Sequence, residues 1–378
     1  MRMLVWYWGR RGGGPRYTLE LLRALAERPD IELAASLSSG NEVLSELPAL
    51  RGPQQIVDTY SDVRSFVGAS LRLPAIRRDF SRFIRSARPD VVVSVMPHPW
   101  SWYLAQAVPA SGSRLVSIIH DAYMHPGEIN PLWSWRIGRE LAAADRVVAL
   151  SRHVQQQLVT GYRYPADRIA VIPLGPFAYA DETEAPRLFP RGRPFRFLFF
   201  GRVLAYKGIR VLLDAFRALA GERNDVELCI AGGGDLAPYR ALLADLPRVT
   251  VINRWIEECE IPRLLSEADA LVAAYTEASQ SAAVATAYGS GMPVVVTPVG
   301  GLVEQVVPGE TGLVAAETSG AAVARAMSAL LEPRLYERCA AGARQAASDG
   351  AGWRRTAETL VEHCAVAGGV LAPAAAAS

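Results

Sequence analysis

Residues 195–208 read Phe-Arg-Phe-Leu-Phe-Phe-Gly-Arg-Val-Leu-Ala-Tyr-Lys-Gly. The apolar run at 195–200 predicts a buried strand, and the apolar spacing of residues 209–220 predicts the helix that follows it. Lys207, just before that helix, is the only lysine among the 40 basic residues of the chain. Two cations, Arg202 and Lys207, beyond the end of a buried strand suit an anion such as a diphosphate. The alternative is a pair of solvated cations on a surface loop.

Apolar runs alternate with helix-like segments on both sides of this stretch. Further strands are expected at 3–7, 31–37, 90–96, 115–119, 146–150, 226–231, 249–252, 270–274 and 293–296. Continuous apolar strands separated by helices are typical of parallel sheets that are covered on both faces. Such sheets bind ligands at the carboxyl ends of their strands, so we expect a site in a cleft between two doubly wound α/β domains.

The domain boundary is expected in a proline-rich segment with an acidic run at 181–184. The expected parts are an N-terminal domain at 1–178, a linker at 179–194, a C-terminal domain at 195–350, a helix at 351–367 that packs back on the N-terminal domain, and a disordered tail at 368–378. The length of 378 residues agrees with two domains.

Composition excludes several classes of protein. Half of the residues are hydrophobic, which excludes a disordered chain, and the net charge of +2 gives no reason to expect a nucleic-acid partner. No apolar run approaches the ~18–20 residues of a membrane span. The four cysteines lack C-x-x-C spacing, which argues against a disulfide framework or a zinc site. We therefore expect a cytoplasmic protein.

A glycine loop, Gly12-Gly13-Gly14, follows the first expected strand and precedes a helix expected at 15–27. Glycines at this place allow a close approach of the backbone to an anion, which the amino end of the helix then stabilises. A purely structural turn is the alternative.

Taken together, these segments resemble the family 4 glycosyltransferases, and the resemblance covers nearly the whole chain. The motifs that carry it are the glycine loop, Ile119-His120-Asp121, residues 147–151 and 171–175, Gly-Arg…Lys-Gly at 201–208, and residues 229–234, 291–295 and 300–304. The resemblance implies the GT-B fold, two facing Rossmann-like domains with a cleft between them. It also implies transfer of a sugar from a nucleoside diphosphate sugar with retention of configuration.

The resemblance implies roles for individual residues. Arg202 and Lys207 would hold the donor diphosphate, so that no metal or other cofactor is required, and the chain has no Asp-x-Asp triplet to bind Mg²⁺. His120 and Glu277 would position the transferred sugar. Further donor contacts are expected at Gly13, Gly14, Gly233, Asn253, Arg254, Trp255, Ser279, Gln280, Ser281 and Glu304. Acceptor-side candidates are Trp8, His98, Trp100 and His125.

One motif departs from the family. Members typically carry two glutamates eight positions apart, and here Glu277 takes the first role while Thr286 stands at the position of the second. The hydroxyl and amide groups at 279–281 are expected to replace the missing carboxylate. This departure leaves open a catalytically weak or inactive nucleotide-sugar-binding partner in a glycan-assembly complex. A GT-B epimerase of nucleotide sugars is a third interpretation.

Residues 71–88 interleave arginines with Ile76, Phe80, Phe83 and Ile84. A basic amphipathic helix can lie on an anionic membrane, and the same pattern fits a helix that packs its apolar stripe on a sheet. Peripheral contact with the inner face of the membrane is therefore left open. A glycan, a lipid-linked acceptor and a small molecule all stay open as the acceptor.

Overall fold

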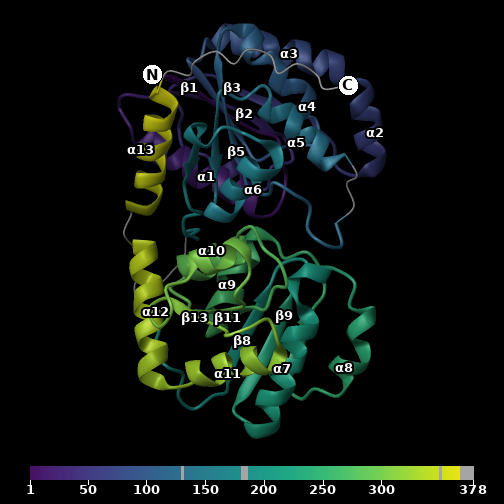
Figure 1. Ribbon diagram of the computed structural model, residues 1–378, viewed down its shortest axis with the longest axis vertical. Coiled ribbons are helices and arrows are strands. Elements are labelled where there is room, and N and C mark those ends of the chain that lie inside the picture. Colours follow the sequence, from purple (N-terminus) through teal and green to yellow (C-terminus); the bar gives the residue numbers. More distant parts are fainter. Residues whose placement is uncertain (129–131, 180–185, 349–350, 367–378) are drawn as a thin grey trace.

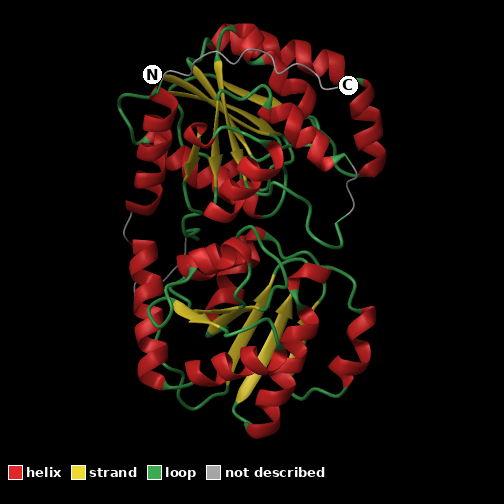
Figure 2. Ribbon diagram, viewed as in Figure 1, coloured by secondary structure: helices red, strands yellow, loops and turns green. Residues whose placement is uncertain are grey.

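The structure is a computed structural model and describes residues 1–128, 132–179, 186–348 and 351–366. It consists of two α/β domains stacked along the long axis of the molecule, each built around a parallel sheet (Figures 1 and 2). The acidic run at 181–184 and the expected tail at 368–378 lie outside the described residues. The predicted architecture of two facing doubly wound domains is confirmed.

The N-terminal sheet has seven parallel strands in the order β3-β2-β1-β4-β5-β6-β7. The strands are β1 (Arg2–Tyr7), β2 (Glu32–Ser38), β3 (Gln54–Val57), β4 (Val91–Val95), β5 (Arg114–Ile119), β6 (Arg146–Ala149) and β7 (Ile169–Val171). The helices are α1 (Gly13–Ala26), α2 (Val63–Leu71), α3 (Leu73–Ala87), α4 (Ser101–Leu104), α5 (Trp133–Leu141) and α6 (Arg152–Tyr162). The apolar runs of the central strands are fully buried because helices cover both faces of the sheet.

The C-terminal sheet has six parallel strands in the order β10-β9-β8-β11-β12-β13. The strands are β8 (Phe195–Phe200), β9 (Val226–Ala231), β10 (Val249–Ile252), β11 (Ala270–Ala273), β12 (Val294–Val296) and β13 (Gly312–Val314). The helices are α7 (Ile209–Glu222), α8 (Arg240–Ala244), α9 (Ile261–Ser266), α10 (Ala282–Gly289), α11 (Gly320–Leu330) and α12 (Pro333–Ser348). The apolar run at 195–200 therefore forms an inner strand of this sheet, β8, between β9 and β11.

Three strands, β3, β7 and β13, were not predicted from the sequence. All three are short strands at the edges of the two sheets. An edge strand has a neighbour on one side only and is less covered, so its sequence needs no long apolar run. In β3, for example, every residue keeps some exposure. The strands that were predicted begin and end within two residues of the expected positions.

The last described helix, α13 (Ala351–Ala365), returns to the N-terminal domain and packs along α1 (Figure 1). The indole Nε1 of Trp353 donates a hydrogen bond of 2.6 Å to the carbonyl of Pro176, and its ring packs edge-on against Tyr17. His363 lies 3.1 Å from the carbonyl oxygen of Val147 in β6. The chain thus crosses between the two domains twice, once through the linker and once before α13.

Helix α3 packs its apolar stripe into the core of the N-terminal domain. Ile76, Phe80 and Ile84 are buried there, and the ring of Phe80 contacts Trp6 and Trp8. The structure therefore uses this stripe for packing on the sheet, and the opposite side of α3 presents arginines to solvent.

No helix in the described ranges combines the length and the apolar character needed to cross a membrane.

Candidate active site

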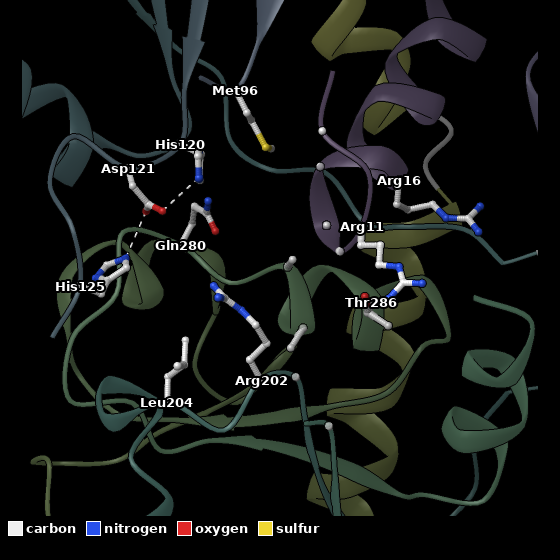
Figure 3. Close-up of a pocket in the computed structure, with 18 of the residues that line it drawn as sticks. Arg11, Arg16, Met96, His120, Asp121, His125, Arg202, Leu204, Gln280 and Thr286 are labelled. Atoms are coloured by element: carbon white, nitrogen blue, oxygen red, sulfur yellow. Dashed lines mark hydrogen bonds and ion pairs between the residues drawn. The ribbon is translucent and has the colours of Figure 1, made fainter. Parts of the chain in front are cut away.

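A cavity of about 1060 Å³ lies between the two domains (Figure 3). Loops that follow the carboxyl ends of β1, β4 and β5 line it from the N-terminal domain, and loops after β8, β9 and β11 line it from the C-terminal domain. This is the place at which doubly wound sheets bind ligands. The cleft expected from the order of strands and helices is therefore present.

Arg202 and Lys207 reach this cavity from the turn between β8 and α7. The Lys207 ammonium lies 3.9 Å from the ring centre of Tyr275 and 4.9 Å from that of Tyr206. Burial alone would lower the pKa of Lys207, but the two tyrosines outweigh it and raise the pKa above its ordinary value, so the side chain stays charged. Gly208 allows the turn to lie here, since a Cβ on it would meet the carbonyl oxygen of Ala274.

The Arg202 guanidinium points up into the cavity (Figure 3) and donates a hydrogen bond of 2.7 Å to the carboxylate of Glu128. Glu128 belongs to the N-terminal domain, so this ion pair joins the two walls of the cavity. No motif in the sequence points to Glu128, because only the fold brings the loop after β5 opposite the end of β8.

The glycine loop lies on the opposite wall, where α1 begins. The Gly12 N–H donates a hydrogen bond of 2.6 Å to the carboxylate of Glu42, and burial raises the pKa of Glu42 to about 7. A Cβ on Gly13 would lie 2.6 Å from the Cβ of Ala282 at the start of α10. The loop thus presents backbone to the cavity and lets the two domains approach closely.

A chain of four ionisable side chains starts in the cavity at the end of β5 and links the two domains. His120 Nε2 lies 3.1 Å from Asp121 Oδ2, and His125 Nε2 lies 3.2 Å from Asp121 Oδ1. His125 Nδ1 in turn lies 3.1 Å from Glu277 Oε1 of the C-terminal domain. Burial alone would raise the pKa of Asp121, but the two imidazoles together with the hydroxyl of Ser279 hold it well below its usual range.

Five of the ten further donor contacts reach the cavity: Gly13, Gly14, Gly233, Trp255 and Gln280. Thr286, at the position of the missing second glutamate, also lines it. Glu277 is not among the lining residues, but it contacts His125, which is one of them. These residues come from both domains, and the structure brings them together around one space (Figure 3).

Five expected donor residues do not line the cavity, and each has a partner elsewhere. Asn253 accepts from the Gly234 N–H, and Arg254 pairs with Glu260. Ser279 is buried beside Asp121. Ser281 caps the amino end of α10 through the Val284 N–H.

Glu304 is the fifth of these residues. Its carboxylate accepts hydrogen bonds of 2.8 Å and 2.9 Å from the N–H groups of Arg152 and His153. These N–H groups open α6 of the N-terminal domain. Glu304 therefore stabilises the amino end of a helix across the domain interface, and it is not among the residues that line the cavity.

The acceptor-side expectations are corrected in part. His98 and His125 line the cavity, whereas Trp8 and Trp100 are buried in the core of the N-terminal domain and do not reach it. Trp8 Nε1 donates to Ser36 Oγ at 3.0 Å, and Trp100 Nε1 donates to Ser70 Oγ at 3.1 Å. Both indoles pack against the ring of His98, which separates them from the cavity. The aromatic rings that do face it include Tyr60 and Trp133.

Comparison with known proteins agrees with this geometry. The family model described as "Glycosyltransferase Family 4" matches residues 11–175, and the model described as "Glycosyl transferases group 1" matches residues 194–333. The D-inositol 3-phosphate glycosyltransferase of Xylanimonas cellulosilytica is 30% identical, over 94% of this chain and 91% of its own length. The chain belongs to glycosyltransferase family 4.

Other relatives of this family 4 glycosyltransferase differ in their stated activities. The glycogen synthase of Mycobacterium tuberculosis is 28% identical over 79% of this chain and 72% of its own length. Among solved structures, Anabaena HepE in complex with UDP-glucose matches with a TM-score of 0.71 at 17% identity, covering 96% of this chain and 100% of its own. This structural match confirms the GT-B fold of the glycosyltransferase.

Proposed function

We propose that this glycosyltransferase moves a sugar from a nucleoside diphosphate sugar to an acceptor with retention of configuration and without a metal ion. The C-terminal domain binds the donor, and the N-terminal domain binds the acceptor. The observation that carries the proposal is the projection of Arg202 and of the only lysine, Lys207, into the interdomain cavity opposite the glycine loop.

The two cations and the glycine loop suit the charge that develops in this reaction. Cleavage of the sugar–phosphate bond leaves a nucleoside diphosphate, and positive groups fixed near the leaving oxygens lower the barrier. Lys207 stays charged in its tyrosine-walled position, and Arg202 reaches the same cavity. The amino end of α1, at Gly13, adds a positive dipole end from the opposite domain. A metal ion is not needed for this task.

The sugar itself is assigned to the space between His120 and Glu277. His120 lines the cavity at the end of β5, and Glu277 lies in the loop after β11 of the other domain, in contact with His125. In a front-face retaining reaction a donor phosphate oxygen accepts the proton of the acceptor hydroxyl, so His120 is given a positioning role. Thr286 and Gln280, which line the cavity, offer neutral hydrogen-bonding groups where the second glutamate is missing.

The acceptor is assigned to the N-terminal wall, where Tyr60, His98 and Trp133 face the cavity. Burial lowers the pKa of His98 to about 3, so this imidazole is neutral and can form a hydrogen bond with a hydroxyl group of the acceptor.

We further propose that the arginine side of α3 contacts an anionic membrane that carries a lipid-linked acceptor. Leu71, at 81% exposure, and Val67, at 59%, lie beside it on α2. Co-sedimentation with anionic but not neutral vesicles tests this contact.

The donor site is tested by thermal stabilisation with UDP, GDP and ADP in the presence of EDTA. We expect one nucleotide to stabilise the wild-type protein and to lose this effect in Lys207→Ala. Arg210→Ala is a matched control, because Arg210 lies three residues away in α7 and pairs with Asp214 on the exposed face of the helix. Equal stabilisation of all three proteins would overturn the diphosphate assignment.

Turnover separates the transferase from the inactive partner that the missing glutamate leaves open. Slow release of free sugar from the matching sugar nucleotide, or transfer to an added acceptor, supports the enzyme. Binding of the nucleotide sugar without hydrolysis or transfer to any acceptor class would favour the binding partner. Conversion of the donor sugar to an epimer without acceptor would instead indicate an epimerase.

A further inference from the structure

His125 lies at the meeting point of the two domains, although it belongs to the loop after β5. Its side chain is only 7% exposed, and its two ring nitrogens contact two different carboxylates. Asp121, from its own domain, lies 3.2 Å from Nε2, and Glu277, from the other domain, lies 3.1 Å from Nδ1. The ring of Tyr206 stacks on it, with centres 4.4 Å apart.

These contacts define the protonation state of the ring. An ionised carboxylate only accepts hydrogen bonds, so an imidazole that bonds to two of them must carry a proton on each nitrogen. Burial alone would lower the pKa of His125, but Asp121 and Glu277 outweigh it and raise the pKa above the ordinary value of 6.5. The charged ring is held between two negative groups and has no other polar partner among the described residues.

The surroundings of the ring come from three segments. The ionisable groups around it are Asp121 with its neighbour His120, Glu128 from the same loop, Tyr206 and Lys207 from the turn before α7, and Glu277 from the loop after β11. Asp121 also interacts with the charge of Lys207, but of the described side chains around Asp121 only His125 bridges to Glu277. Loss of the His125 proton therefore leaves Asp121 and Glu277 close together without the charge that separates them.

We propose that His125 is a positioning residue of the transferase reaction, a charged bridge that fixes the Glu277 carboxylate of the C-terminal domain to Asp121 of the N-terminal domain. The proposal rests on the function proposed above, in which Glu277 contacts the donor sugar. Because the bridge spans both domains, it orients Glu277 only when the cleft has the spacing seen here. Binding of the sugar is thereby linked to the relative position of the domains.

The bridge predicts a specific effect on donor binding. Glu277 meets the sugar and not the nucleotide, so removal of the bridge should weaken the sugar contact alone. The measured quantity is the ratio of the Kd of a nucleoside diphosphate to the Kd of its sugar conjugate. Three pairs are first tested on the wild type: UDP with UDP-glucose, GDP with GDP-mannose and ADP with ADP-glucose. The pair that the wild type binds is then used for all variants.

In His125→Gln we expect this ratio to fall about tenfold at pH 6.5, the scale of one lost hydrogen bond to a charged group, while the Kd of the nucleotide alone is unchanged. The wild-type ratio should also fall as the pH rises through the raised pKa of His125, and the variant should lack this dependence. His153→Gln is the matched control, because His153 lies at the domain interface but contacts Gln157.

A double-mutant cycle with Glu277→Gln guards against a merely structural effect. If His125 acts through Glu277, the double variant should resemble Glu277→Gln alone. An unchanged ratio and pH profile in His125→Gln, or additive losses in the double variant, would overturn the proposal and leave the proposed function intact. A wild type that binds no nucleotide, or for which the sugar adds no affinity, would overturn both.

Discussion

Glu128 of the N-terminal domain holds Arg202 of the C-terminal domain in a 2.7 Å ion pair across the cavity. Arg202 is one of the two cations assigned to the donor diphosphate, and in this structure its guanidinium is paired with a carboxylate of the protein. A comparable arrangement exists at the glycine loop, where Glu42 accepts from the Gly12 N–H. The groups proposed to receive phosphate are thus held by carboxylates that a donor has to displace.

The first prediction concerns this competition. In Glu128→Gln the charge that holds Arg202 is removed, so we expect the nucleoside diphosphate to bind about two- to fivefold more tightly. The gain is modest because Arg202 is 58% exposed and exposed ion pairs are worth about 0.2–1 kcal/mol. Titration calorimetry with wild type and variant measures it. Asp214→Asn, which removes an exposed partner of Arg210, is the control. Weaker binding in Glu128→Gln would show that Glu128 belongs to the donor site.

The second prediction concerns turnover. Lys207→Ala should lower turnover about 100-fold or more, which is the scale of losing one group that stabilises charge in the transition state. Lys207→Arg should recover only part of the loss, since a planar guanidinium does not fit the compact position between Tyr206 and Tyr275. Initial rates of donor hydrolysis or transfer measure both variants. Near-normal turnover in Lys207→Ala would remove this residue from the mechanism.

The third prediction concerns pH and stability. Burial raises the pKa of Glu42 from 4.5 to about 7. Between these values the folded chain keeps a proton that the unfolded chain has released, so this group makes stability fall as the pH rises through the window. Glu42→Gln should therefore melt at a higher temperature than wild type at pH 8 and at nearly the same temperature at pH 5. The expected gain is ~1 kcal/mol, because the side chain is partly exposed. A difference in melting temperature between Glu42→Gln and wild type that stays the same from pH 5 to pH 8 would contradict this prediction.

The fourth prediction concerns the approach of the two domains. Gly13→Ala places a Cβ about 2.6 Å from that of Ala282, so the domains must separate slightly at the glycine loop. We expect turnover to fall at least about tenfold, since a small misplacement of the reacting groups has a large effect on rate. Gly138→Ala in α5, where a Cβ meets nothing within 4 Å, is the control. Unchanged turnover in Gly13→Ala with an intact circular dichroism spectrum would refute the role of the loop.

The inner strands and the family were accessible from the sequence alone. The runs that became β1, β4, β5, β8, β9 and β11 are continuously apolar because both faces of a parallel sheet are buried, and this leaves a strong local signal. The sequence also singled out Arg202 and Lys207, because these cations follow a buried strand closely and the lysine is unique in the chain. Short edge strands such as β3 carry no such signal.

The tertiary structure decided which side chains meet. Glu128, Glu42 and the bridge from His125 to Glu277 join segments that are far apart in the chain, and their spacing in the sequence carries no information about contact. Trp8 and Trp100 come after strands, which is why they were expected on the acceptor side, but their side chains are buried in the core. Local sequence determined the strands, the turns and their chemistry, because these depend on neighbouring residues. The direction of each side chain, and hence the site, depended on how two separate sheets pack together.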